Sequence, residues 1–328
     1  MNLSQIGELS LLEMIRKRFS AVAEGLVLGI GDDAAIISTG GRTLVTTDMM
    51  VEGVHFDLTW TTPFQLGFKL VSVNISDIYA MGGTPRYVLL DFAAPRNCTL
   101  RFFEHFFDGV ESALRTYAAS LVGGDISSSD RIMLSVTAIG SASKAVRRQG
   151  ARVGDRIYVT GMLGDAACGL EVLRKVKHTV DPEKEMQRGF PFPWSAAAPL
   201  LRRHLMPVAR DPSGIRGIAT AMIDVSDGLL IDLGRLCRES GVGAKILLND
   251  VPVSDAMKTI SSCLGLSPVD LALSGGEDYE LLFSASPRQK VKAACIGEIT
   301  RSGITVVGAK GRRVKTPGKG YQHFSVQI

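Results

Sequence analysis

The sequence predicts a mixed fold, α/β with α+β character, in two domains. Helical and strand patterns alternate along most of its 328 residues, a length that allows one large domain or two of ordinary size. The hydrophobic fraction of 45% is enough to bury a core. Residues 140–144 are small and polar, so we expect one domain at residues 1–142 and a second at 143–328.

The first half is expected to hold two helices and several strands. An apolar strand at residues 44–47 is predicted to end in Asp48. Thr62 and Pro63 form an N-cap and a first-turn proline, which predict a helix that runs to Met81. A second helix, capped by Thr99, should bury Phe102, Phe103, Phe106, Val110 and Leu114, which recur at helical spacing. Further strands are predicted at residues 86–92, 120–122 and 132–139.

The second half is expected to continue this alternation. A strand at residues 156–160 and a helix at 166–176 are predicted, followed by a long polar surface loop at 177–195. Further apolar runs end at Ile223, Leu248 and Leu273. The segment at 274–280 is expected to lie between two strand-like segments.

Composition and charge exclude several classes of protein. The net charge of +4 is close to balance, and the basic residues form no run interleaved with aromatics, so we expect no nucleic-acid partner. The five cysteines form no CxxC pair, which argues against zinc and disulfides and fits a reducing compartment. Residues 1–19 do not have the pattern of a signal peptide, and no apolar run approaches the length of a bilayer span. We therefore expect a cytoplasmic protein without a membrane partner.

Acidic residues follow glycine turns or apolar runs at six places in the chain. These places hold Asp32 and Asp33, Asp48, Asp77, Asp125, Asp224 and Asp227, and the pair Glu277 and Asp278. One such acid by itself is usually a turn residue or a helix cap. In α/β folds, however, ligands collect at strand ends, so we expect several of these acids to converge.

Converging carboxylates repel one another and would take up protons unless a cation lies between them. Carboxylate, hydroxyl and water oxygens are the ligands that Mg²⁺ prefers, and Mn²⁺ can take its place. The usual phosphate-binding loops are missing, because there is no GxxxxGK[ST] and the Gly29-Ile30-Gly31 turn lacks the third glycine of a dinucleotide motif. The acids therefore predict a magnesium site that holds a phosphate-rich substrate through metal ions.

Three segments together resemble the thiamine-monophosphate kinases, which belong to the superfamily of aminoimidazole ribonucleotide synthetase and selenophosphate synthetase. They are Gly-Ile-Gly-Asp-Asp-Ala-Ala (29–35), Thr-Thr-Asp-Met-Met-Val-Glu-Gly-Val-His-Phe (46–56) and Ser-Gly-Gly-Glu-Asp-Tyr-Glu (274–280). The resemblance covers the chain from Gly29 to Phe324, with the motifs in the family's order. It implies an aminoimidazole ribonucleotide synthetase-like fold: an N-terminal ATP- and Mg-binding domain, whose sheet forms a homodimer, and a C-terminal α/β domain that closes the active-site cleft.

The resemblance also assigns site residues. Those that match magnesium positions are Asp32, Asp33, Thr46, Thr47, Asp48, Asp77, Asp125, Asp224 and Asp227. Those that match nucleotide-contacting positions are Tyr117, Gly124, Asp125, Arg148 and Ser226. Those that match positions touching thiamine phosphate are His55, Glu277 and Tyr321. Arg148 could also be a solvated surface residue, His55 an ordinary strand-end histidine and Tyr321 a core residue.

The activity that the resemblance implies is ATP-dependent phosphorylation of thiamine monophosphate to thiamine diphosphate. The acceptor phosphate, with a second pKa near 6 by analogy with phosphorylated side chains, is mostly a dianion at neutral pH. It needs no general base, so we expect direct metal-assisted transfer without a catalytic side chain or a phosphoenzyme. Two alternatives stay open: another ATP-dependent synthetase of the same superfamily, and a non-catalytic module that binds ATP or metal.

Overall fold

The chain divides into two compact units in the computed structural model, which describes residues 14–15, 17–19, 24–28, 36–38, 42–184 and 189–314. The first unit includes residues 83–145 and nearly everything before them, and the second begins at Val146 and also takes in Ala80–Gly82. Across these described ranges, no helix combines the length and the apolar character that a membrane span requires.

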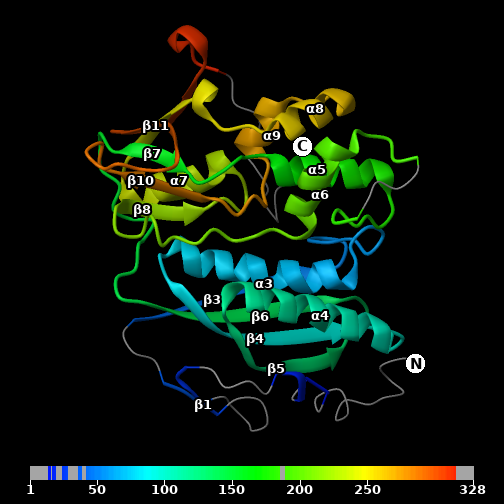
Figure 1. Ribbon diagram of the computed structural model, residues 1–328. Coiled ribbons are helices and arrows are strands. Elements are labelled where there is room, and N and C mark those ends of the chain that lie inside the picture. The colour runs from blue at the N-terminus through cyan, green and yellow to red at the C-terminus, as the bar shows by residue number, and fades with distance from the viewer. Residues whose placement is uncertain are drawn as a thin grey trace. The chain divides into compact units, whose positions relative to one another are not determined.

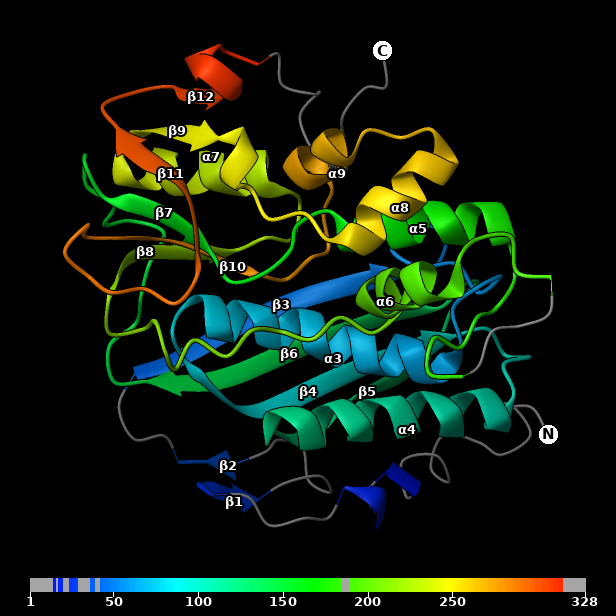
Figure 2. The same ribbon diagram turned by 45° about the horizontal axis from the view of Figure 1, so that its top comes forward.

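The first unit is built on a four-stranded sheet with two helices on one face (Figures 1 and 2). The strand order is β3-β6-β4-β5, in which β4 and β5 are parallel and the other neighbours are antiparallel. The strands are β3 (Arg42–Val51), β6 (Met133–Ala142), β4 (Thr84–Ala94) and β5 (Ser120–Ser128), and the helices are α3 (Pro63–Ala80) and α4 (Leu100–Tyr117). Two short antiparallel strands, β1 (Leu26–Leu28) and β2 (Ile36–Ile37), come before them.

Both helix starts agree with the sequence prediction. The Thr62 hydroxyl accepts from the Gln65 N–H at 3.3 Å and the Gln65 side chain accepts from the Thr62 N–H at 2.9 Å, which makes a capping box for α3. Thr99 caps α4 by accepting from the Phe102 N–H at 3.1 Å. These side chains satisfy N–H groups that have no partner within the helix.

The aromatic residues of α4 form the core beneath the sheet. The ring centroid of Phe92 on β4 lies 5.4, 5.2 and 6.4 Å from those of Phe103, Phe106 and Phe107. The prediction named Phe102, which is only half-buried, and did not include Phe107, which is buried. The opposite face of the sheet exposes Val45 and Met49 of β3 and Met133 of β6.

Two strands are longer than the sequence predicted. Strand β3 does not end at Asp48, because its pairing with β6 continues to Val51. Strand β5 does not end before Gly124 and Asp125, because its parallel pairing with β4 continues to Ser128. Backbone pairing with the neighbouring strand thus overrides the turn signals of the glycines and acids, and these acids lie within strands rather than after them.

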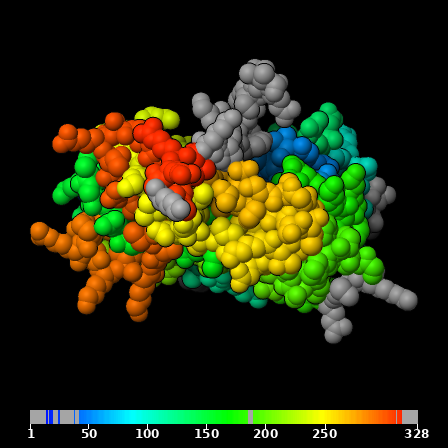
Figure 3. Space-filling model, turned by 90° about the horizontal axis from the view of Figure 1, so that it is seen from above, coloured from blue at the N-terminus to red at the C-terminus, as the bar shows by residue number. Residues whose placement is uncertain are grey.

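The second unit contains a six-stranded mixed sheet of order β12-β9-β11-β7-β10-β8. The strands are β7 (Arg156–Val159), β8 (Ala219–Asp224), β9 (Gly243–Leu247), β10 (Leu281–Ala285), β11 (Ala294–Thr300) and β12 (Ile304–Val307). The helices are α5 (Asp165–Val176), α6 (Trp194–Leu205), α7 (Leu229–Ser240), α8 (Asp255–Leu264) and α9 (Pro268–Ser274), with short 3-10 turns at Leu248–Asp250 and Ala309–Gly311. In Figure 3 the gold surface of α8 and α9 adjoins the green surface of the segment that contains α5.

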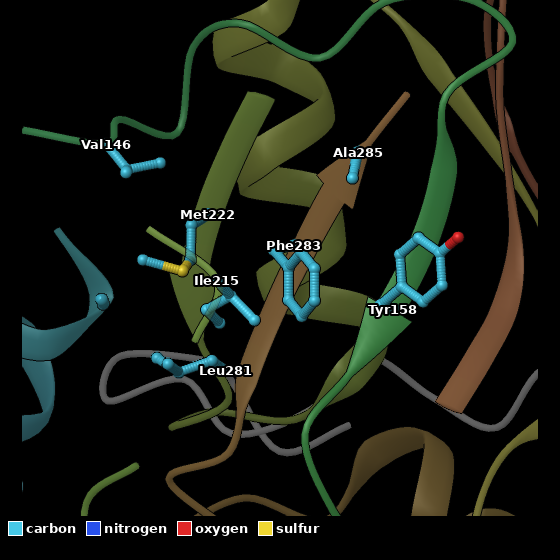
Figure 4. Packing of buried hydrophobic residues seen from close by; sticks show 8 residues of the cluster. Val146, Tyr158, Ile215, Met222, Leu281, Phe283 and Ala285 are labelled. Carbon is cyan, nitrogen blue, oxygen red and sulfur yellow. The ribbon is translucent and has the colours of Figure 1, made fainter. Parts of the chain in front are cut away.

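An apolar cluster in this unit includes side chains of β8 and β10. Phe283 stacks on Tyr158 of β7 with ring centroids 5.4 Å apart, and Met222 of β8 and Ile215 lie beside them (Figure 4). The strand at 156–160 and the helix at 166–176 were correctly predicted, and the described residues of 177–193 form neither helix nor strand. The segment before Ser274 is helix α9 and not a strand, because Ser267 caps a helix that starts with Pro268.

Candidate active site

Two polar clusters, one in each unit, hold several of the described site residues. In the first unit, α3 lies against strand β3 and supplies the partners of two predicted ligands. The Thr46 hydroxyl donates to Oδ2 of Asp77 at 2.6 Å, and the Asp48 N–H donates to Oδ1 of Asn74 at 2.9 Å. Because β3 is an edge strand, Asn74 satisfies an N–H that no neighbouring strand reaches. Asn74 is fully buried, and the sequence interpretation missed it.

Thr47 lies on the other face of β3, because successive side chains of a strand alternate. Its hydroxyl donates to the carbonyl of Val136 at 3.0 Å and lies 3.4 Å from the hydroxyl of Thr137. The structure therefore brings Thr46 and Asp77 together and directs Thr47 away from them.

Asp125 lies beside Asp91, a residue that the sequence interpretation did not include. The two are register partners on β5 and β4, and both line a shallow hollow with Met49 and Met133. Burial, and then the charge of Asp125, raises the pKa of Asp91. Asp48 and Asp125 stand on the two opposite edge strands of the sheet, about 14 Å apart at the usual strand spacing.

Gly124 allows the close approach of β5 to β4. A Cβ at this position would lie 1.9 Å from the carbonyl oxygen of Leu90, and the φ of Gly124 is +148°. Only glycine fits there, so the packing of the two strands by itself requires a glycine at position 124. The predicted nucleotide contact of Gly124 stays a prediction.

The other predicted contact residues of the first unit have different settings. Nδ1 of His55 accepts from the Val51 N–H at 3.0 Å in a tight turn after β3, so a neutral His55 carries its proton on Nε2. Tyr117 is buried, and its hydroxyl donates to Ser72 at 3.0 Å between α4 and α3. Asp32 and Asp33 lie outside the described residues, as does Tyr321 of the second half.

In the second unit, the loop from Asp224 to Gly228 joins β8 to α7 around one buried carboxylate. Oδ2 of Asp232 accepts from the N–H groups of Ser226, Asp227 and Gly228 at 3.1, 3.0 and 3.1 Å. Burial raises the pKa of Asp232 to about 6, although the charge of Arg235 and the N–H groups of Asp227 and Gly228 lower it. Asp232 thereby fixes the backbone that carries Ser226 and Asp227.

Arg235 links this carboxylate to the predicted metal ligand. It contacts Oδ1 of Asp232 at 2.7 Å and Oδ2 of Asp227 at 2.6 Å. The sequence interpretation missed both Asp232 and Arg235. Their spacing of three along α7 would have suggested an ion pair on one helix face, without showing that it serves Asp227. Arg148 is exposed, and its carbonyl accepts from Ser240 at 2.9 Å.

The residues Glu277–Glu280, which we call the strap, connect several elements of the second unit. The Glu277 N–H donates to the carbonyl of Ser226 at 2.7 Å, and the Tyr279 N–H donates to the carbonyl of Val225 at 2.9 Å. Glu277 and Tyr279 have φ values of 66° and 50°, in the left-handed region that non-glycine residues rarely adopt. The strap thus lies directly on the loop of Ser226 and Asp227.

Two fully buried acids hold the strap in place. Asp278 accepts from the N–H groups of Gly164 and Ala166 at 2.6 and 3.1 Å, at the start of α5. Glu280 pairs with Arg203, with Arg210 through two contacts at 2.8 and 2.7 Å, and with Thr160 at 2.5 Å. Burial would raise the pKa of Glu280, but Arg210, Arg203 and Thr160 together outweigh it and hold this pKa below its usual value.

The donor chemistry of these clusters fits Mg²⁺. Thr46, Asp48, Asp77, Asp224 and Asp227 offer only hard oxygen ligands. Within the described part of the chain, no three His, Cys, Asp or Glu side chains gather around one position where they could hold a metal. Open sets of one or two carboxylates suit Mg²⁺, which commonly keeps waters and substrate phosphates in its coordination shell.

Family models match both halves of the chain. The model described as "AIR synthase related protein, N-terminal domain" matches residues 31–142, and the corresponding C-terminal model matches residues 152–312. The mixed two-unit fold is therefore that of an AIR synthase related protein.

Known relatives narrow this class. The thiamine-monophosphate kinase of Aquifex aeolicus is 35% identical over 331 residues, covering 99% of this chain and 100% of the relative. That of Escherichia coli K12 is 34% identical, covering 97% and 98%. The structure of AaThiL complexed with AMPPCP and TMP superimposes with a TM-score of 0.77 at 35% identity, over 99% of each chain. A thiamine-monophosphate kinase from Stenotrophomonas maltophilia K279a gives 0.79 at 33% identity, over 93% and 96%. The chain belongs to the thiamine-monophosphate kinase family.

Ionisation of Asp278 is expected to weaken the folded state as the pH rises. Burial raises the pKa of Asp278 to about 7, so the folded protein keeps a proton that the unfolded chain releases near pH 4. This contribution to stability is complete below about pH 4 and is lost as the pH rises through about 7. Urea unfolding at several pH values should show wild-type stability falling relative to Asp278→Asn across this interval. Parallel pH profiles of the two proteins would contradict the assignment.

Proposed function

We propose that the protein transfers the γ-phosphoryl group of ATP to thiamine monophosphate and makes thiamine diphosphate and ADP. The observation that carries this proposal is the likeness, over 99% of both chains, to AaThiL complexed with AMPPCP and TMP. The same reaction is the last step of thiamine diphosphate synthesis in the family that the sequence resembles. We propose a cytoplasmic location, because the five cysteines are all free, as is usual in a reducing compartment.

The main obstacle to this reaction is repulsion between two polyanions. The acceptor phosphate is already a nucleophile near pH 7, so the protein has to hold and orient the two substrates and need not remove a proton. Mg²⁺ supplies charge neutralisation and alignment of the transferred group. The residues proposed to hold the metal ions are Asp32, Asp33, Thr46, Thr47, Asp48, Asp77, Asp125, Asp224 and Asp227.

The remaining site residues are proposed to hold the organic parts of the substrates. Gly124, Asp125, Arg148, Ser226 and Tyr117 are proposed as nucleotide contacts, and His55, Glu277 and Tyr321 as contacts of thiamine monophosphate. The main chains of Ser226 and Glu277 are joined by a hydrogen bond. This bond supports the proposal that the two residues belong to one site. Tyr117 is 5% exposed, so a nucleotide contact there would need a change in its packing.

A homodimer is proposed on the open face of the first unit's sheet. Val45 and Met49 of edge strand β3 are 65% and 53% exposed, which is unusual for large apolar side chains and favours a partner surface. We expect sedimentation velocity at micromolar concentration to show a dimer, and Met49→Glu to shift it towards monomer because a charge there would be desolvated. A wild-type monomer under these conditions would refute the dimer.

The carboxylates of Asp48 and Asp227 test the metal assignment in each unit. Asp48→Asn and Asp227→Asn keep shape and remove one negative charge, so each should lower turnover by about 10- to 100-fold and raise the Mg²⁺ concentration needed for half-maximal rate. Thiamine diphosphate formation, followed over a Mg²⁺ titration, measures both effects. Asp130→Asn is the matched control, because Asp130 lies exposed in the turn between β5 and β6. Near wild-type turnover of either variant at millimolar Mg²⁺ would make that acid a turn or structural residue.

A further inference from the structure

The last turn of helix α6 contacts the strap through two consecutive residues. Nδ1 of His204 lies 3.0 Å from Oε2 of Glu277, a close contact that lacks the alignment of a hydrogen bond, and the Arg203 guanidinium pairs with Glu280. The side chain of His204 is 7% exposed and that of Glu277 is 30% exposed. One face of the Glu277 carboxylate therefore meets a buried imidazole while part of the side chain stays accessible.

The position of His204 is fixed by close packing of α6 on α5. A Cβ on Gly169 of α5 would lie 2.2 Å from the carbonyl oxygen of Leu200 and 3.3 Å from Cβ of His204. Gly169 thus allows the backbones of α5 and α6 to approach closely beside His204. Because tight packing restricts the His204 side chain to one position, the imidazole can hold the Glu277 carboxylate in one orientation.

The backbone of Glu277 is held by the loop that contains Ser226. Its N–H donates to the carbonyl of Ser226, and a Cβ on the preceding Gly276 would lie 2.5 Å from that same oxygen. The left-handed φ of 66° at Glu277 is unfavourable for a residue with a side chain, and such strain persists only where the surroundings determine it. The strain at Glu277 therefore points to a carboxylate whose placement matters.

We infer that His204 is a positioning residue, whose imidazole contacts Oε2 of Glu277 through Nδ1 and directs this carboxylate towards the thiamine part of the acceptor. This inference rests on the proposed function, in which Glu277 contacts thiamine monophosphate. A carboxylate in this place suits the cationic thiazolium of that substrate, whereas it offers ATP only repulsion. His204 should accordingly govern affinity for thiamine monophosphate and leave affinity for ATP unchanged.

Two amide substitutions separate positioning from general packing. The side-chain nitrogen of His204→Asn stands near the place of Nδ1, and that of His204→Gln stands near the place of Nε2. Both put a polar amide in the same buried site, so a loss of packing would affect both. We expect His204→Asn to bind thiamine monophosphate within a few-fold of wild type, and His204→Gln to bind about 10- to 100-fold more weakly because the contact of the Nδ1 position with the Glu277 carboxylate is lost.

The test is isothermal titration of the whole protein with thiamine monophosphate, and separately with a non-hydrolysable ATP analogue, together with KM for both substrates. Arg202→Ala is the control, because Arg202 lies on the same turn, is exposed and pairs with Glu183. Glu277→Gln in an otherwise wild-type chain should lose the same affinity if the His204 variants fold poorly. Equal thiamine monophosphate affinity in the Asn and Gln variants, a parallel loss of ATP affinity, or an unaffected Glu277→Gln would overturn the inference. Wild-type protein that binds no thiamine monophosphate would instead refute the proposed function.

Discussion

The buried charge of Glu280 is the constraint on which the second unit's site depends. A carboxylate without exposure to water is costly unless its charge is matched, and removing one partner of a buried pair typically costs about 3–5 kcal/mol. Here the matching groups come from α6, from the segment after it and from the end of β7. Because these donors meet at one place, their contacts with Glu280 fix the position of the strap. The same strap contacts the Ser226 loop through the N–H groups of Glu277 and Tyr279.

In the first unit, hydrogen bonds rather than ion pairs hold the segment that carries the predicted ligands. Helix α3 supplies Asn74 and Asp77, one turn apart, to the N–H of Asp48 and the hydroxyl of Thr46 on the edge strand. In both units, groups that are fully or largely buried hold a backbone segment in place, and the predicted ligands lie on that segment. Some acids of the second unit are therefore structural: Asp232 and Asp278 accept from backbone N–H groups and hold the segments that carry the proposed ligands.

Local signals in the sequence predicted much of the fold. The caps at Thr62 and Thr99 and the apolar spacing of α4 depend on neighbours within a few residues, so they could be read directly. The lengths of β3 and β5 could not, because their pairing with distant strands overrides the local turn signals at Asp48 and Gly124. The supporting residues Asn74, Asp91, Asp232, Arg235 and His204 were missed for a related reason. Asn74, Asp91 and His204 lie beside partners that only the folded chain brings near. Asp232 and Arg235 look in the sequence like an ordinary ion pair on a helix, and only the structure shows that they hold the loop of Ser226 and Asp227.

The central claim is that the protein joins a phosphoryl group of ATP to a phosphate acceptor and does not release it to water. ³¹P NMR of purified protein with ATP, Mg²⁺ and thiamine monophosphate follows all of these species in one sample. We expect ADP and thiamine diphosphate to appear together in equal amounts, without inorganic phosphate. Release of inorganic phosphate in step with ADP, with the thiamine monophosphate resonance unchanged, would contradict it and favour a synthetase of the same superfamily. ATP that binds but is never consumed would favour a non-catalytic nucleotide-binding protein.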